Sequence, residues 1–220
     1  MNDPADPHRG QPVLAAGVPL AGAKAAMIMI HGRGADAGDI LGLADTIGRD
    51  DIACLAPEAA GHAWYPQRFI APVAMNQPWL ASALGVIDRL VATCGENGIP
   101  PERVALLGFS QGACLSLEFA ARRPRRYGAV FALTGGLIGE RVDAADYAGS
   151  LAGTPVFIGS GDADPHIPLA RVRDSASIMR GLGAEVTERI YPGLPHTVIP
   201  DEIAHVRRIL DGMMAADPPP

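Results

Sequence analysis

Positive charge is scarce in this sequence of 220 residues, which carries a formal net charge of −6 at pH 7. Proteins that bind nucleic acids or anionic membranes need clustered, excess lysine and arginine, so the composition argues against both classes. Long apolar runs are also lacking, because the longest, such as residues 25–30 (AAMIMI), have only the length of a strand. A transmembrane helix needs about 20 apolar residues. We therefore expect no nucleic-acid partner and no membrane insertion.

Cysteine is rare as well, with three residues, and its positions do not suggest a metal site. The three thiols lie in apolar or helical surroundings without metal-ligand spacing, and we interpret them as reduced packing residues: Cys54, Cys94 and Cys114. The start of the chain, MNDPADPHRGQP, has neither the basic nor the apolar region of a secretory signal, so we expect a cytoplasmic protein. Residues 1–12 and the proline-rich residues 216–220 are expected to be flexible ends, unlikely to pack, around one domain at residues 13–215.

Hydrophobic residues make up 48% of the chain and charged residues 19%, which is typical of a globular domain. Short apolar runs typical of buried strands alternate with helical patterns along the sequence. The expected strands cover residues 25–30, 52–57, 104–107, 128–134, 155–160 and 186–191, and the expected helices 39–49, 78–94, 111–123, 169–182 and 201–214. This alternation predicts an α/β fold with a mostly parallel sheet covered by helices on both faces.

A serine stands between two glycines where one expected strand passes into a helix, in the pentapeptide Gly108-Phe109-Ser110-Gln111-Gly112. The glycines remove the Cβ atoms that would clash when strand and helix fold back on each other. Such a turn exposes the serine oxygen beside the free N–H groups of the helix, which favour a developing oxyanion. We therefore predict that Ser110 is a nucleophile, against the simpler interpretation of a tight turn.

A serine nucleophile needs a base, and the base needs a carboxylate to orient it. In sheets of this kind sites form at the carboxyl ends of the strands, so the loops there are searched for both partners. The loop after residues 155–160 offers Asp162, which suits a tight turn through its own backbone, and Asp164, which we favour as the acid. Of the histidines that follow, we choose His196 as the base because it lies in a loop between a strand and a helix.

Two backbone N–H groups are expected to bind the oxyanion. One belongs to Gln111, the residue after the nucleophile, and the other to Arg33 in the loop His31-Gly32-Arg33-Gly34, which follows the strand at residues 25–30. Glycines such as Gly32 let the backbone approach a ligand closely.

Four segments, in this order and spacing, resemble the carboxylesterase branch of the α/β-hydrolases: HGRGAD, GFSQGA, GDADPHIP and YPGLPH. That branch includes acyl-protein thioesterases, lysophospholipases and bacterial phospholipase/carboxylesterase-like proteins. The resemblance covers about residues 25–210 and implies a single-domain α/β-hydrolase that hydrolyses esters or thioesters with a serine, without metal or organic cofactor. It also implies that the second aspartate of the G-D-x-D segment, Asp164, is the acid.

Arg33 stands where the thioesterase members of that branch usually have leucine, so we expect no long acyl tunnel of their kind. A buried cation needs a partner, and a carboxylate or phosphate on the substrate is one candidate. The irregular segment 58–76 is the expected pocket wall. Its aromatic residues Trp64, Tyr65 and Phe69 either line the pocket or anchor the segment to the core, and His166 is expected at the pocket rim.

The sequence as a whole predicts a serine carboxylesterase that acts on small-molecule esters. Two alternatives stay open within enzymes: a thioesterase or lysophospholipase, and a dienelactone-type hydrolase that uses the same groups. A third alternative is a non-catalytic hydrolase fold that only binds small molecules, although such a receptor has no need of a base, an acid and both oxyanion loops. The natural substrate and a homodimeric state are also left open.

Overall fold

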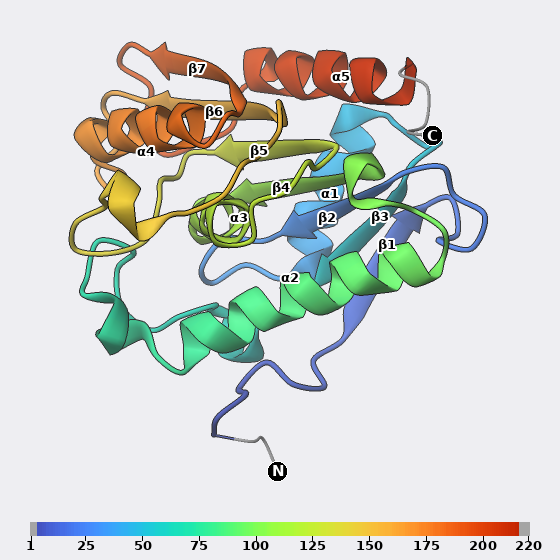
Figure 1. Cartoon of the computed structure of the whole chain (residues 1–220), viewed down its shortest axis with the longest axis horizontal. Helices are drawn as coiled ribbons and strands as arrows, with labels where there is room; N and C mark the ends of the chain where they lie inside the picture. Colours follow the sequence, from blue (N-terminus) through green and yellow to red (C-terminus); the bar gives the residue numbers. More distant parts are fainter. Residues whose placement is uncertain (1–3, 216–220) are drawn as a thin grey trace.

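A seven-stranded, mostly parallel β-sheet forms the centre of the molecule (Figure 1). The computed structural model describes residues 4–215, and the strands follow the order β1-β3-β2-β4-β5-β6-β7 across the sheet. Their bounds are Val13–Gly17 (β1), Ala26–Ile30 (β2), Ala53–Pro57 (β3), Val104–Phe109 (β4), Ala129–Leu133 (β5), Pro155–Gly161 (β6) and Glu185–Tyr191 (β7). Strands β2 to β7 run parallel, whereas β1 pairs antiparallel with β3.

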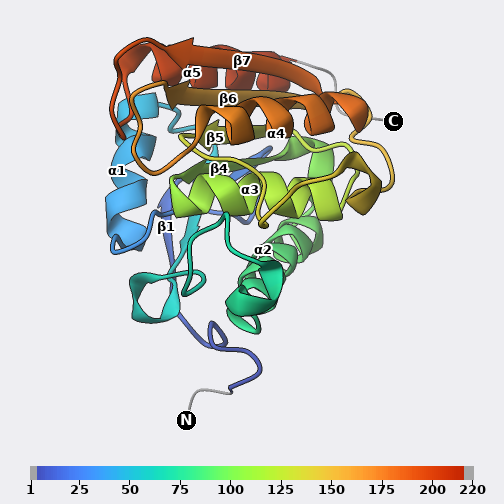
Figure 2. The ribbon, with the colours of Figure 1, turned by 90° about the vertical axis from the view of Figure 1, so that its left-hand side faces the viewer.

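Helices cover both faces of the sheet, as the second view shows (Figure 2). The α-helices are α1 (Ala37–Ile47), α2 (Trp79–Glu96), α3 (Gln111–Arg122), α4 (Leu169–Gly181) and α5 (Pro200–Ala215). Residues of α1 and α5 share one hydrophobic cluster with Met27 and Met29 of β2, and residues of α2, α3 and α4 share the other with Ile28 and Ile30 of the same strand. Because alternate side chains point to opposite faces, a central strand between two helical layers must be apolar throughout.

The predicted fold class is therefore confirmed, and each expected strand or helix lies within two residues of its predicted bounds. Strand β1 is the exception, because the sequence analysis did not predict it. Its side chains are mostly exposed, since only β3 flanks it, and so it lacks the continuous apolar pattern of the central strands. It also ends at Gly17, where φ is 74° and a Cβ atom would lie 2.1 Å from the carbonyl oxygen of Ile52.

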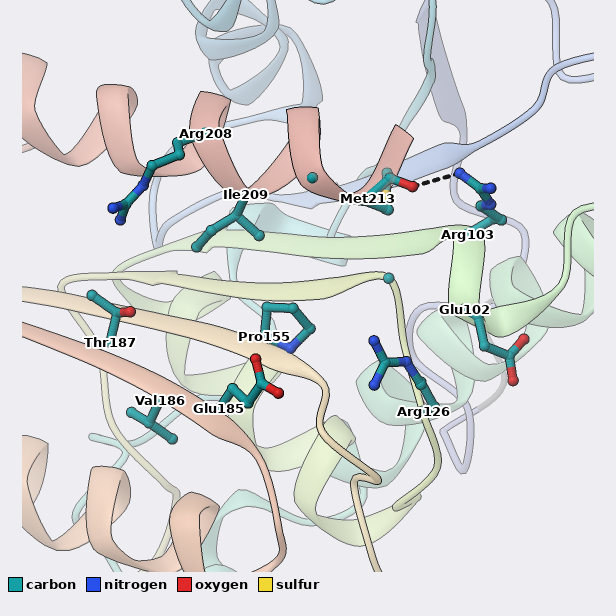
Figure 3. A pocket seen from close by; sticks show the side chains of 12 residues that line it. Glu102, Arg103, Arg126, Pro155, Glu185, Val186, Thr187, Arg208, Ile209 and Met213 are labelled. Carbon is teal, nitrogen blue, oxygen red and sulfur yellow. Dashed lines mark hydrogen bonds between the residues drawn. The ribbon is translucent and has the colours of Figure 1, made fainter. Parts of the chain in front are cut away.

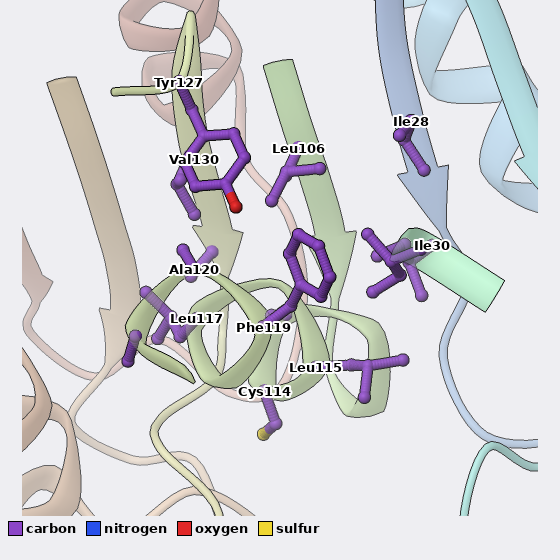
Figure 4. Packing of buried hydrophobic residues seen from close by; sticks show 14 of the residues in the cluster. Ile28, Ile30, Leu106, Cys114, Leu115, Leu117, Phe119, Ala120, Tyr127 and Val130 are labelled. Atoms are coloured by element: carbon purple, nitrogen blue, oxygen red, sulfur yellow. The ribbon is translucent and has the colours of Figure 1, made fainter. Parts of the chain in front are cut away.

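Helix α3 is buried along almost its whole length, so its position is fixed by packing on every side. Phe119 points toward Leu106 of β4, and Ala120 points toward Val130 of β5 (Figure 4). The fixed helix holds its first residue, Gln111, at the carboxyl edge of the sheet.

The start of the chain is held to the domain through His8, which differs from the expectation that the proline-rich residues 1–12 are too loose to pack. His8 is 2% exposed, and its Nε2 lies 3.0 Å from the carbonyl oxygen of Trp64. Its Nδ1 accepts a hydrogen bond from the N–H of Ala60 at 3.1 Å, and its own N–H donates to Ser82 Oγ at 3.0 Å. The partners are more than fifty residues away in sequence. The composition of residues 1–12 alone therefore gives no sign of these hydrogen bonds.

The remaining residues of the expected flexible ends, 1–3 and 216–220, lie outside the described residues. Between β3 and α2 the chain forms the long irregular segment that the sequence predicts, with short 3₁₀ turns at Ala60–His62 and Val73–Asn76. None of the helices within residues 4–215 combines the length and the apolar character that a membrane span requires.

Candidate active site

Ser110 lies on a sharp turn between β4 and α3, in a backbone conformation that residues with side chains rarely adopt. Its φ and ψ are 55° and −115°, and its hydroxyl points to His196 instead of capping helix α3. The flanking glycines are required because backbones touch there. A Cβ atom on Gly108 would lie 2.1 Å from the carbonyl oxygen of Gly112, and one on Gly112 would lie 2.0 Å from that of Ile30. The predicted strand-to-helix turn is confirmed.

Ser110, His196 and Asp164 form one hydrogen-bonded chain at the carboxyl edge of the sheet. His196 Nε2 lies 2.9 Å from Ser110 Oγ, and His196 Nδ1 lies 2.7 Å from Asp164 Oδ2. A carboxylate only accepts hydrogen bonds, so the proton on Nδ1 points to Asp164 and leaves Nε2 free to accept the serine proton. The residues come from the loops after β4, β7 and β6, which the sheet brings together.

The two aspartates of the acid loop have different contacts. The Asp164 side chain is fully buried, and its Oδ1 accepts the N–H groups of His166 at 2.7 Å and Ile167 at 3.1 Å. The Asp162 side chain accepts the N–H of Gly193 at 2.6 Å. Asp162 therefore ties the acid loop to the histidine loop, which differs from the expectation that it serves a tight turn through its own backbone. Asp164 alone reaches the imidazole.

Neighbouring loops hold the histidine loop in place. A Cβ atom on Gly161, at the end of β6, would lie 1.9 Å from the carbonyl oxygen of Leu194, so the two backbones are in direct contact. On the other side, Thr134 Oγ1 donates to the carbonyl oxygen of Thr197 at 3.3 Å. These contacts flank His196 and restrict the position of its ring.

Glu202 is a buried carboxyl near the start of α5, below the histidine loop. Its Oε2 accepts the N–H of Ile199 at 3.0 Å, while Oε1 is buried and has no hydrogen-bond partner within the described part of the chain. Burial raises the pKa of Glu202 to about 7, and the nearby Asp201 adds to the effect. Its protonation near neutral pH therefore affects the stability of this loop.

The predicted oxyanion loop, residues 31–34, lies directly beside the serine. A Cβ atom on Gly32 would lie 3.4 Å from Ser110 Cβ. His31 is fully buried, with Nδ1 2.7 Å from the carbonyl oxygen of Gly32 and Nε2 accepting the N–H of Ala59 at 3.1 Å. Burial lowers the pKa of His31, so the ring is neutral and carries its proton on Nδ1. The ring thus bonds the loop to the segment that follows β3.

The guanidinium of Arg33 is bound by backbone carbonyls. Its Nη2 donates to the carbonyl oxygens of Tyr65 at 2.8 Å and Gln67 at 2.7 Å, and its Nη1 donates to that of Pro66 at 3.0 Å. We expected a carboxylate or phosphate on the substrate as a partner for this cation. The structure supplies three carbonyl partners from the chain itself, and the expected contact with a substrate anion stays a prediction.

A cavity of about 500 Å³ opens beside Ser110. Its walls are formed by Arg33, Tyr65, Pro66, Gln67, Arg68, Phe69, Ser110, Gln111, Cys114, His166, Ile167 and His196. Tyr65, Phe69 and His166 thus lie where the sequence predicts. Gly32 borders a second cavity of about 370 Å³ on the other side of His196. Trp64 lines neither of these two cavities, because its fully buried indole donates to the carbonyl oxygen of His31 at 3.0 Å.

Arg68, Cys114 and Ile167 line the cavity although the sequence analysis did not point to them. Ile167 lies three residues after Asp164 in the GDADPHIP segment, and this closeness to the acid could have predicted its place in the cavity wall. Cys114 faces the cavity from the first turn of α3, one turn beyond the nucleophile. Arg68 is an exposed residue on an irregular segment, and no pattern in the sequence marks its position.

A larger cavity, of about 670 Å³, lies at the other edge of the sheet (Figure 3). Its walls include Pro155 at the start of β6, Glu185 at the start of β7 and Met213 near the end of α5. Ligand sites of parallel sheets form at the carboxyl ends of the strands, and these residues lie at the amino ends. The cavity beside Ser110 is therefore the candidate site, although it is the smaller of the two.

Other chemistries have less support from these residues. A thiolate is the reactive form of cysteine, and burial raises the pKa of Cys114 to about 12 and those of Cys54 and Cys94 to about 11. These thiols therefore stay protonated at neutral pH, as expected for packing residues. Among residues 4–215, no group of three or more histidine, cysteine, aspartate or glutamate side chains is placed to hold a metal ion.

Comparison with known proteins assigns this chain to one family. Residues 18–214 match the model of the phospholipase/carboxylesterase family. Acyl-protein thioesterase 1 of Gibberella zeae is 33% identical over 117 residues, which are 52% of this chain and 50% of that protein. The enzyme of the same name from Saccharomyces cerevisiae is 30% identical over 129 residues, 56% of this chain and 55% of that protein. The chain thus matches about half the length of these curated relatives.

Solved structures agree over a longer part of the chain. A phospholipase/carboxylesterase from Dyadobacter fermentans superposes with a TM-score of 0.88 at 45% identity, covering 91% of this chain and 97% of that one. Esterase PE8 superposes with a TM-score of 0.75 at 25% identity, covering 92% of this chain and 98% of that one. The resemblance noted in the sequence is confirmed.

Proposed function

Because this chain belongs to the phospholipase/carboxylesterase family and has the α/β-hydrolase fold, we propose that it hydrolyses small carboxylic esters with Ser110 as the nucleophile. In this proposal His196 is the general base and Asp164 orients it. The observation that supports it best is the hydrogen-bonded chain of these side chains, with distances of 2.9 Å and 2.7 Å on the two sides of the imidazole. This is the arrangement that activates a serine hydroxyl.

In the first half of the proposed reaction, Ser110 Oγ attacks the ester carbonyl carbon while its proton passes to His196 Nε2. The carbonyl oxygen becomes an oxyanion, which the backbone N–H groups of Gln111 and Arg33 stabilise. The Asp164 carboxylate stabilises the positive imidazolium that forms. When the tetrahedral intermediate collapses, the bond to the alcohol breaks, and the leaving oxygen takes the proton from His196. The products of this half are a free alcohol and an acyl-serine.

The second half repeats these steps with water as the nucleophile. His196 Nε2 takes a proton from a water molecule, whose oxygen attacks the acyl carbon, and the same N–H groups stabilise the second oxyanion. Collapse breaks the bond to Ser110 Oγ, which recovers its proton from the imidazolium. The carboxylic acid leaves and the enzyme returns to its starting state.

The cavity limits the acyl or alcohol group that fits. A volume of about 500 Å³ bounded by Phe69 and Ile167 suits a short apolar group, and Tyr65 is part of its wall. The segment 58–76 is held by bonds to Arg33. A wall bonded in this way is unsuited to act as a mobile lid. We therefore propose short acyl esters in solution as substrates.

Thioesters are a second candidate substrate class. The curated relatives carry the name acyl-protein thioesterase 1, and the same nucleophile, base and oxyanion donors can cleave a thioester. The leaving thiolate needs less help from the protonated His196 than an alkoxide does, because thiols are the stronger acids. A parallel assay of one acyl group as its ester and as its thioester would compare the two classes.

The test is hydrolysis of p-nitrophenyl acetate and of an acetyl thioester by the wild type, Ser110→Ala and His196→Ala. We expect both variants to lose almost all activity and to lose similar amounts, because the groups act as a unit. Ser150→Ala, at an exposed serine remote from the site, is the matched control and should keep the wild-type rate. Full activity in Ser110→Ala, with its fold intact by circular dichroism, would refute the proposal.

A further inference from the structure

We propose that the side chains of Arg33 and Gln111 fix the spacing of the two oxyanion donors by bonding to one shared acceptor, the backbone carbonyl of Tyr65. Each of these residues has two parts with different tasks. In the proposed mechanism the backbone N–H binds the reacting oxygen, while the side chain bonds to the pocket wall. This inference rests on the proposed function of the site and adds two positioning side chains to it.

The contacts that carry the inference converge on one oxygen. Arg33 Nη2 lies 2.8 Å from the carbonyl oxygen of Tyr65, and Gln111 Nε2 lies 2.9 Å from the same atom. The Gln111 amide uses its oxygen as well, accepting the N–H of Trp64 at 2.8 Å. The remaining bonds of Arg33 go to the carbonyl oxygens of residues 66 and 67. Both donor residues are therefore bonded to the same short stretch of backbone.

That stretch is itself held by hydrogen bonds, so it can serve as a support. The Trp64 indole donates to the carbonyl oxygen of His31, and the N–H of Gly34 donates to the carbonyl oxygen of His62 at 2.7 Å. Further along, the N–H of Gln67 donates to Asn76 Oδ1, on a side chain that is fully buried. The support is thus hydrogen-bonded on both sides of Tyr65, to the loop after β2 on one side and to the buried Asn76 on the other.

A shared support links the two donors, which belong to separate parts of the chain. The Arg33 N–H lies in the loop after β2, and the Gln111 N–H lies at the first turn of α3. The backbones of these parts touch where Gly112 meets Ile30, and the shared acceptor adds a hydrogen-bonded link through the two side chains. Donors stabilise an oxyanion well only at about 2.7–3.1 Å from its position, and removing one such donor costs about 10²–10³-fold in kcat. A displacement of about 1 Å can cost about 10²-fold.

This role differs from substrate recognition by the charge of Arg33. A guanidinium that attracts an anionic substrate acts on binding, so its loss raises KM for anionic esters and leaves neutral esters unaffected. A guanidinium that positions an oxyanion donor acts on the transition state, so its loss lowers kcat for both kinds of ester by the same factor. Comparing one neutral ester with one anionic ester therefore distinguishes the positioning role from the binding role.

The experiment measures kcat and KM of Arg33→Met for p-nitrophenyl acetate, which is neutral, and mono-p-nitrophenyl succinate, which is anionic. We expect kcat to fall by about 10–100-fold for both esters, with KM changed less than about threefold. Arg33→Lys has one ammonium group in place of the planar guanidinium, so its kcat should lie between those of the wild type and Arg33→Met. Gln111→Met should resemble Arg33→Met, and the double variant should lose less than the product of the two single losses.

Arg49→Gln is the matched control, because Arg49 is also bound on two sides, by Asp51 and Asp211, but lies away from the cavity. It should keep kcat within about twofold. Unchanged kcat in Arg33→Met, or a loss seen only in KM for the anionic ester, would overturn the inference. If Arg33→Met does not fold, Arg33→Lys decides by the same criteria. Wild-type protein that hydrolyses neither ester would count against the proposed function instead.

Discussion

Replacing Glu202 by glutamine should change how the stability of the protein depends on pH. The carboxyl is fully buried, and burial raises its pKa from an ordinary value of 4.5 to about 7. Between these values the folded protein holds a proton that the unfolded chain has already released. The contribution of Glu202 to stability is therefore complete below pH 4.5 and is lost as the pH rises through 7.

The size of this loss follows from the pKa difference between the folded and unfolded states. Each pKa unit corresponds to about 1.4 kcal/mol, so the full difference corresponds to about 3 kcal/mol of unfolding free energy. Glutamine has nearly the same shape, and its oxygen can still accept the N–H of Ile199. Its amide nitrogen carries no charge that burial could penalise. Glu202→Gln should gain about 2–3 kcal/mol relative to the wild type between pH 5 and pH 8.

The assay is urea unfolding at 25 °C, followed by tryptophan fluorescence at pH 5, 6, 7 and 8, for the wild type and Glu202→Gln. Other titrating groups are common to both proteins, so the difference between the two curves isolates residue 202. Glu96→Gln, at an exposed carboxyl in α2, is the control, and its curve should run parallel to that of the wild type. A Glu202→Gln curve that also runs parallel to the wild type would refute the reasoning.

The remaining predictions concern the site itself. Asp164→Asn should lower kcat by about 10⁴-fold, because the amide no longer stabilises the imidazolium, whereas Asp162→Asn should cost far less, since it only weakens the bond to Gly193. If Asp162→Asn is the silencing change, the acid is wrongly assigned. Ser110→Gly should be more stable than Ser110→Ala by about 1 kcal/mol in urea unfolding, because glycine tolerates the positive φ; equal stabilities would contradict strain at this turn. Across p-nitrophenyl esters from acetate to palmitate, kcat/KM should peak at short chains, each methylene adding up to about 0.8 kcal/mol while room remains. Sharp activation at the onset of micelles would contradict the proposal that the segment 58–76 is a fixed wall.

Local patterns in the sequence were enough to predict the central sheet. A strand that is covered on both faces needs an unbroken apolar run, and residues 25–30 and 104–107 show one directly. Strand β1 lies at the edge of the sheet, so its composition is mixed and no such run exists. His8 is the second example, because its burial depends on hydrogen bonds to residues 60–82, which no local pattern reveals.

In the candidate site, too, some features follow from local sequence patterns and others depend on distant parts of the chain. The positions of Ser110, His196 and Asp164 follow from motifs at the ends of strands, and the structure brings them within hydrogen-bond distance. The tasks of side chains that bond to backbone carbonyls were not predictable in this way. The sequence alone does not show whether Arg33 contacts a substrate anion or backbone carbonyls more than thirty residues away in the chain. Only the fold shows which partner is present.

The most direct test of the proposed chemistry is covalent labelling with a fluorophosphonate at pH 7, measured by intact mass and then by peptide mapping. The reagent reacts with a serine only when a base has activated it and an oxyanion site receives the phosphoryl oxygen. The account predicts one adduct per chain, located on Ser110, and no adduct on Ser110→Ala. An adduct on another residue, or an unmodified wild-type protein that is folded, would contradict it.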